Sequence, residues 1–160
     1  MNDAIETMNI TVDAPEAGWS AIRFGKEAFI PLSYVQNIPE DIIDAAEAWM
    51  AGEDVNLFCD GEGEIWELRM PTGDNTVAID DMDGHIRTTG IPTKVCLLQL
   101  IDGMLMNVRG WAIWQSMCDG EEIEYENRLD AWNVYIAGRT EGLADRLRAC
   151  LLYTSPSPRD

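Results

Sequence analysis

The side chains that most often perform acid-base or nucleophilic chemistry are scarce in this sequence. His85 is the single histidine among 160 residues, so a histidine pair for metal binding or acid-base catalysis is excluded. A cysteine nucleophile would have to pair His85 with Cys59, Cys96 or Cys118, whereas a histidine just after a tight turn is expected to be exposed. The sequence has neither a Gly-x-Ser-x-Gly elbow nor a Cys-x-x-Cys pair. We therefore predict no catalytic residue, and free, mostly buried thiols.

Carboxylates are the abundant reactive groups, and two acidic segments could supply cation ligands or hydrolytic acids. In the segment 80–84, aligning Gly84 with the invariant glycine of an EF-hand puts Ile79 and Gly90 at the two anchoring ligand positions. An Asp-Gly hairpin turn is the better interpretation, with a weak Ca²⁺ or Mg²⁺ site as the alternative. A metal-dependent hydrolase built on carboxylates would need several acids to converge in one pocket, from the run Asp60, Glu62, Glu64 and Glu67. We predict no metal and no cofactor.

The charge balance excludes several classes of partner. The chain has 29 acidic and 11 basic residues and a formal net charge of -18, which repels phosphate backbones and anionic headgroups. We therefore expect no direct nucleic-acid binding and no membrane binding. An apolar run at 93–117 contains Asp102 and Arg109, each of which would cost about 3 kcal/mol near a bilayer centre. The acidity favours a basic protein partner. The alternative is adaptation to a salt-rich cytoplasm, which the low lysine content also supports.

One segment combines clustered carboxylates with tryptophan. Five acidic residues lie between Asp119 and Glu126, where mutual repulsion favours a solvated loop or the start of a helix. Trp111 and Trp114 precede this run and are expected to form a partly exposed patch, and a second acidic edge is expected at 60–64. The predicted partner-binding residues are Trp111, Trp114, Asp119, Glu121, Glu122, Glu124, Glu126, Asp60, Glu62 and Glu64. The tryptophans expected in the core are Trp49, Trp66 and Trp132.

The first two thirds of the chain are expected to alternate strands with one helix. Strands are expected at 9–12, 19–24, 28–32, 55–59, 64–70, 76–80 and 85–89. A helix is expected at 39–51, because Pro39 suits its first position and Gly52 follows its end. The last four strands should form an antiparallel meander, and the alternation along 64–70 predicts one buried and one solvated face.

The remaining third is expected to be helical. Nearly every residue from Thr93 to Val108 is apolar, which predicts a central helix that is buried on most sides. Gly110 is expected to interrupt this helix. A last helical region is expected at 127–149, with a break suggested by Gly138 and Gly142. Together these elements predict an α+β fold in which antiparallel hairpins and a meander pack on one central apolar helix and additional helices.

The order of elements from Gly18-Trp19 through Met70, together with the acidity, resembles small bacterial immunity-type domains, the antitoxin partners of polymorphic toxins. The resemblance implies a non-catalytic inhibitor whose acidic face blocks a basic active site, for instance that of a nuclease. The function predicted is therefore that of a binding domain for a basic protein. Two alternatives stay open: the carboxylate-based hydrolase, and a phage or accessory structural protein whose acidity is incidental.

The last eleven residues differ in character from the rest. Residues 150–160 resemble a peptide that recurs at the ends of environmental sequence translations, where a read runs into adapter DNA. Pro156 and Pro158 also oppose any continuation of a helix. We therefore expect a single acidic domain at 1–149 and a non-native tail at 150–160. Acidic residues within 1–15 leave no apolar signal segment there, so a cytoplasmic protein is expected.

Overall fold

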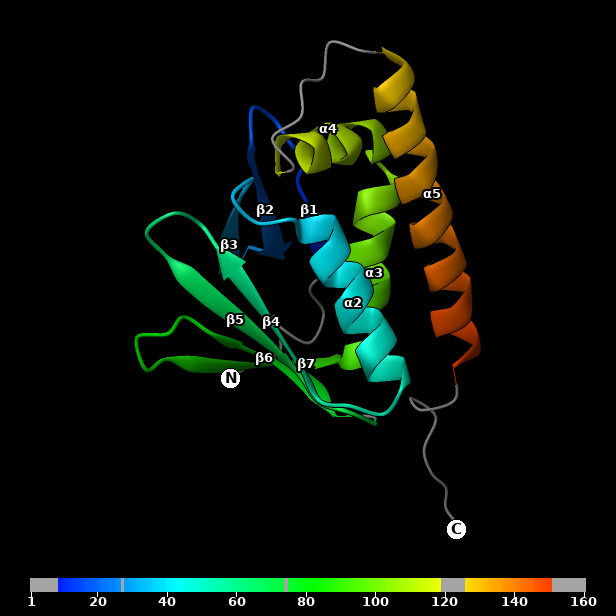
Figure 1. The fold of residues 1–160 in the computed structure, drawn as a ribbon. Helices are drawn as coiled ribbons and strands as arrows, with labels where there is room; N and C mark the ends of the chain where they lie inside the picture. Colours follow the sequence, from blue (N-terminus) through cyan, green and yellow to red (C-terminus); the bar gives the residue numbers. More distant parts are fainter. Residues whose placement is uncertain (1–8, 27, 74, 119–125, 151–160) are drawn as a thin grey trace.

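Two antiparallel sheets lie on one side of the described structure and the helices on the other (Figure 1). The computed structural model describes residues 9–26, 28–73, 75–118 and 126–150, which include only Cys150 of the expected tail. The first sheet has the order β1-β2-β3, with strands Ile10–Val12, Trp19–Phe24 and Ala28–Ser33. The second has the order β4-β5-β6-β7, with strands Val55–Asp60, Ile65–Met70, Thr76–Asp80 and Ile86–Pro92. The predicted α+β class and the antiparallel meander are thus confirmed.

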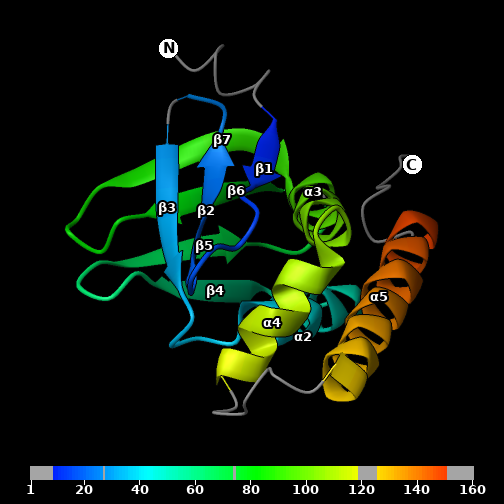
Figure 2. The same ribbon diagram turned by 90° about the horizontal axis from the view of Figure 1, so that it is seen from above.

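The strands of the two sheets run crosswise, and β3 crosses the second sheet close to its hairpin ends (Figure 2). At this crossing a Cβ atom on Gly61 would lie 2.7 Å from Cγ of Pro31, so the close approach requires glycine. Pro31 itself lies in β3, an edge strand, where a missing N–H is tolerated. The hairpins β4–β5 and β6–β7 extend past β3, which leaves both of their turns exposed (Figure 2).

Helix α3, at Thr93–Leu105, is the centre of the helical layer and confirms the predicted central apolar helix. It contacts β1, β6, β7 and the other three described helices. These helices are α2 (Ile38–Met50), α4 (Val108–Cys118) and α5 (Glu126–Ala149). Helix α2 begins at Ile38, one residue before the predicted start, because Oδ1 of Asn37 accepts a hydrogen bond of 3.3 Å from the Glu40 N–H, and Pro39 fits the first turn.

Both predicted helix breaks are wrong. The chain leaves the helix at 106–107, so that Gly110 lies inside α4 instead of between two helices. A Cβ atom on Gly110 would lie 3.2 Å from Cδ of Pro15, so this glycine makes room for the segment before β2. Helix α5 continues through Gly138 and Gly142, because its contacts with α2, α3 and α4 outweigh a cost of about 1 kcal/mol per helical glycine.

The alternation predicted along β5 holds on its inner face, where Leu68 and Met70 are buried. On the outer face Arg69 is exposed, but Glu67 is only 5% exposed, so the prediction of a wholly solvated face is wrong there. Glu67 lies opposite Asp80 on β6, and both carboxylates accept hydrogen bonds from Arg69. A carboxylate that is paired in this way can be buried at a tolerable cost.

The buried core includes Trp49, as predicted, and Trp66 and Trp132 are half-buried against it. The four cysteines are free, also as predicted. Two of them, Cys59 and Cys96, are buried, and burial raises the pKa of each thiol to about 12. None of the described helices combines the length and the apolar character that a bilayer crossing requires.

Candidate binding surface at the hairpin tips

In a meander, alternate turns lie at the same end of the sheet. The β4–β5 turn at 60–64 and the β6–β7 turn at 81–85 therefore lie close together, and we call these two segments the hairpin tips. Both project from the same side of the molecule (Figure 2). The tips contain five carboxylates, those of Asp60, Glu62, Glu64, Asp81 and Asp83, and three of these, Glu64, Asp81 and Asp83, line one shared cavity.

Side-chain hydrogen bonds shape the first tip. Oδ1 of Asp60 accepts a hydrogen bond of 2.8 Å from the N–H of Glu62, which adopts a left-handed backbone with φ of 57°. The Glu62 carboxylate accepts a hydrogen bond from the Ser33 hydroxyl at the end of β3. Nε1 of Trp66 donates to Oε1 of Glu64 at 3.2 Å. The tip thus holds its carboxylates in fixed directions while Glu62 and Glu64 remain exposed.

The second tip repeats this chemistry. Oδ1 of Asp81 accepts a hydrogen bond of 2.9 Å from the Asp83 N–H, and Oδ2 of Asp81 lies 3.1 Å from Nδ1 of His85. The Asp83 N–H, together with the backbone and side chain of His85, lowers the pKa of the Asp81 carboxyl below its usual value. Met82 occupies the left-handed region with φ of 67°, and its side chain is exposed. His85 is exposed as predicted.

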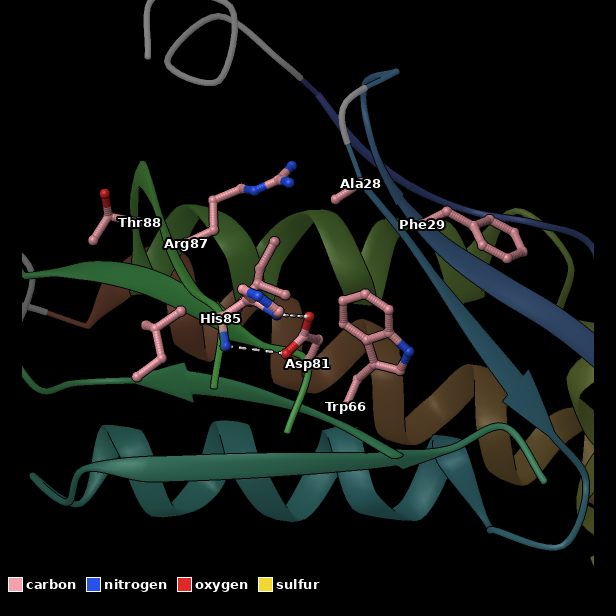
Figure 3. A pocket seen from close by; sticks show the side chains of 9 residues that line it. Ala28, Phe29, Trp66, Asp81, His85, Arg87 and Thr88 are labelled. Atoms are coloured by element: carbon pink, nitrogen blue, oxygen red, sulfur yellow. Dashed lines mark hydrogen bonds and ion pairs between the residues drawn. The ribbon is translucent and has the colours of Figure 1, made fainter. Parts of the chain in front are cut away.

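Two hollows meet at the tips. A cavity of about 330 Å³ between the two turns is lined by Gly63, Glu64, Ile65, Trp66, Asp81, Met82 and Asp83. A cleft of about 440 Å³ opens between β3 and the β6–β7 hairpin, where Trp66 lies beside the Asp81–His85 pair (Figure 3). Trp66 and Asp81 line both hollows. The 330 Å³ cavity is acidic, whereas the 440 Å³ cleft is also lined by Arg87.

The first tip is anchored to the helical layer through Gln36, just before α2. Oε1 of Gln36 accepts a hydrogen bond of 2.8 Å from the Asp60 N–H, and its side-chain amide donates to the Phe58 carbonyl. The Gln36 carbonyl in turn accepts a hydrogen bond of 2.9 Å from Nε1 of Trp114 in α4. The end of β4 is therefore held by a chain of hydrogen bonds that reaches α4.

The ion pairs of the described basic residues lie mostly away from the tips. Arg23 pairs with Asp13, Arg139 and Arg146 pair with Glu47, and these contacts lie on β2 and the helices. Among the side chains described at 9–26, 28–73, 75–118 and 130–150, no lysine or arginine forms an ion pair with Asp60, Glu62, Glu64 or Asp83. As far as the described side chains extend, these four carboxylates thus carry negative charge without a paired lysine or arginine, next to apolar side chains.

The expectation that Trp111 and Trp114 form a partly exposed patch is wrong. The two side chains are 0% and 1% exposed, and their rings pack against each other with centroids 5.0 Å apart. The apolar area of two indoles is better buried between α4 and its neighbours than left beside carboxylates. Neither ring can anchor a partner in this conformation.

The predicted acidic residues divide between two regions. Asp60, Glu62 and Glu64 lie together at the first tip, as the predicted second edge requires. Glu126 begins α5, and its side chain is outside the description. The remaining members of the acidic run, Asp119, Glu121, Glu122 and Glu124, lie outside the described residues.

Besides Gly63, Ile65 and Trp66 of the first hairpin, the predicted site omitted three residues of the second hairpin that line the tip cavity: Asp81, Met82 and Asp83. A signal for them was present in the sequence, because Asp-Gly-Glu-Gly-Glu and Asp-Met-Asp-Gly-His occupy alternate turns of one predicted meander. Alternate turns share one end of a sheet, so the two acidic turns had to be neighbours.

Comparisons of this chain with protein-family models, with curated proteins and with solved structures gave no match. Among the described residues, no group of three or more histidine, cysteine, aspartate and glutamate side chains is arranged to hold a metal ion.

Proposed function

We propose that this chain is a non-catalytic binding domain that engages a basic protein partner through its hairpin tips. The observation that carries the proposal is the convergence of three carboxylates from two turns, those of Glu64, Asp81 and Asp83, on a cavity that Ile65, Trp66 and Met82 also line. Carboxylates next to apolar and aromatic side chains suit a lysine or arginine side chain, which has an apolar stem and a charged end.

The electrostatics favour fast and selective association. A net charge of -18 attracts basic proteins over a distance set by the ionic strength, and it repels acidic ones. Ile65 and Met82 would then contribute apolar contact area once the partner has docked. If the partner surface is a basic active site, as the resemblance to immunity-type domains implies, the bound domain would act as an inhibitor.

The backbone of the tips adds support. Glu62 and Met82, with φ of 57° and 67°, lie in a region that costs non-glycine residues about 1–2 kcal/mol. Backbone strain of this kind persists where the surrounding structure holds it, and it is common at functional sites. The side chains of both residues are exposed at the tips. A glycine at either position would relieve the backbone strain, but it would remove the side chain that could contact a partner.

The experiment is affinity capture from a lysate of the source organism at low ionic strength, followed by mass spectrometry. The tip variant carries Glu64→Lys and Asp83→Lys. The control carries Glu53→Lys and Glu141→Lys, which change the net charge equally at exposed positions away from the tips. We expect a basic protein to be retained by the wild type and by the control, to be lost with the tip variant, and to elute as salt is raised.

Two results would contradict the proposal. Retention of no basic protein by the wild type would exclude a partner of this class in that lysate. Equal loss in both variants would show that overall charge, and not the tips, accounts for retention. Circular dichroism of all three proteins checks that each variant is folded.

A further inference from the structure

The outer face of the second sheet, opposite to the face that carries the buried Leu57, Leu68 and Ile79, carries a row of four side chains across its four strands. The register pairs Phe58 on β4 with Glu67 on β5, Glu67 with Asp80 on β6, and Asp80 with Ile86 on β7. Paired residues project from the same face, so the row places two carboxylates between two apolar side chains. We call these four residues the central row.

The two carboxylates at the middle of the row are buried, although the face itself is open. Glu67 and Asp80 are 5% and 6% exposed, and residues paired across strands have Cβ atoms about 5 Å apart. Arg69 serves both, with Nε 3.1 Å from Oε1 of Glu67 and Nη2 2.6 Å from Oδ2 of Asp80. One guanidinium for two carboxylates leaves a negative charge, which is poorly screened because water is largely excluded.

The ends of the row are exposed. Phe58 and Ile86 are 50% and 55% exposed, and Ile65 and Met82 lie nearby at the tips. These are four of the eleven large apolar side chains that are exposed in the described part of the chain. Such clustering of exposed apolar groups on one face is typical of an interaction surface.

We infer that this outer face is the docking surface for the basic partner. A lysine or arginine of the partner lies over Glu67 and Asp80, and apolar side chains of the partner pack against Phe58 and Ile86. The inference rests on the proposed function and extends it from the tips to the sheet. Charge complementarity selects the occupant, because the row carries net negative charge and acidic residues at the tips adjoin it. A second copy of the chain would bring the same charge to the contact and be repelled.

The spacing of the row predicts the pattern of the partner. Neighbouring strands lie about 4.8 Å apart, so Phe58 and Ile86 are separated by about 14 Å across three such steps. In an extended segment, residues i and i+4 lie about 13 Å apart and project from the same side as residue i+2. A matching segment therefore has an apolar residue, any residue, lysine or arginine, any residue, and a second apolar residue.

The test uses a display library of random twelve-residue peptides, selected on the full chain at low ionic strength. We expect the enriched peptides to be basic and to contain the apolar-x-cation-x-apolar pattern more often than the unselected library. The dissociation constant of one enriched peptide, synthesised without the display scaffold, is then measured for the variants by fluorescence anisotropy.

The row variant carries Phe58→Thr and Ile86→Thr, since threonine retains strand preference and removes the apolar contact. The matched control is Trp19→Thr, an exposed strand residue of the other sheet. We expect the row variant to weaken peptide binding at least tenfold and the control to change it less than twofold. Thermal unfolding followed by circular dichroism checks the fold of each variant.

The failure of this inference differs from the failure of the proposed function. If the tip variant Glu64→Lys/Asp83→Lys abolishes binding while the row variant binds as the wild type does, the docking surface is not the outer face, although the tips still bind. If the selection enriches no basic peptide, both the inference and the proposed function are contradicted.

Discussion

At the scale of single residues, Asp44 shows how the acidity acts against stability. Burial, and then the neighbouring charges of Glu40, Asp41 and Glu47, raise the pKa of the Asp44 carboxyl above its usual value, and Arg139 opposes them only in part. Because the pKa is raised, the folded state binds a proton at this carboxyl more tightly than the unfolded chain does. Its negative charge therefore costs stability above its usual pKa, and this cost is absent in acid.

Replacement of Asp44 should consequently stabilise the protein in a pH-dependent manner. We expect Asp44→Asn to raise the free energy of unfolding by a few tenths of a kcal/mol at pH 7, because repulsion from carboxylates one helical turn away is removed. Near pH 3 the gain should vanish. Urea unfolding at both pH values measures this, with Glu53→Gln as an exposed control outside the helices. An equal effect of Asp44→Asn at both pH values would show that charge repulsion is not the cause.

At the scale of elements, two helical glycines have opposite roles. Gly103 in α3 faces β1, and a Cβ atom there would lie 2.8 Å from Cγ2 of Val12. The same contact region is fixed by the Ile10 N–H, which donates to Oε1 of Gln99 at 2.9 Å. Gly142 in α5 has no neighbour within 4 Å of an added Cβ atom. The first glycine permits helix–strand contact, and the second contributes only flexibility to the unfolded chain.

The two glycines therefore predict opposite effects of the same substitution. Gly142→Ala should raise the free energy of unfolding by about 0.5–1 kcal/mol, because alanine favours the helix. Gly103→Ala should lower it by about 1–3 kcal/mol in spite of the same helical preference, because β1 must move away. Guanidinium unfolding of both variants makes the comparison. Stabilisation by Gly103→Ala would mean that β1 and α3 are less closely packed than the 2.8 Å approach to Val12 indicates.

At the scale of the whole molecule, the net charge of -18 sets the response to salt. Exposed carboxylates outnumber the cations that could pair with them, so the folded state suffers self-repulsion that salt screens. We expect the Tm to rise by several degrees as sodium chloride increases from about 0.01 M to about 0.1 M, where the screening length falls from about 30 Å to about 10 Å. Differential scanning calorimetry measures how the Tm changes with salt concentration. A Tm that stays constant or falls as salt is added would argue against net repulsion.

The tip variant is also informative in that measurement. Two lysines in place of two acids change the net charge from -18 to -14, since each substitution adds two positive charges. A smaller salt dependence of Tm is therefore expected for this variant. The control Glu53→Lys/Glu141→Lys has the same net charge, so a difference between the two variants would report the local repulsion between the tips.

Local chemistry allowed the sequence to determine the elements and the position of the acidic turns. The start of α2 follows from Asn37 and Pro39, and the β4–β5 turn follows from Gly63, which adopts a positive φ of 119°, together with the Asp60 side chain that accepts from the Glu62 N–H. Each of these depends on a few consecutive residues, so no distant part of the chain can change it. The same logic places Asp60, Glu62 and Glu64 at an exposed tip, and the meander topology would have added Asp81 and Asp83.

Only the tertiary structure decided which side chains are accessible and where helices end. Trp111 and Trp114 are buried through contacts of α4 with segments far away in sequence, and Gly110 serves the packing of Pro15 instead of ending a helix. Glu67 is buried because the register sets it opposite Asp80, where Arg69 serves both. Whether a side chain is buried depends on which other segments pack against it. The free energy gained by burying apolar area outweighs the helix and turn preferences of single residues, which are all that a sequence pattern reports.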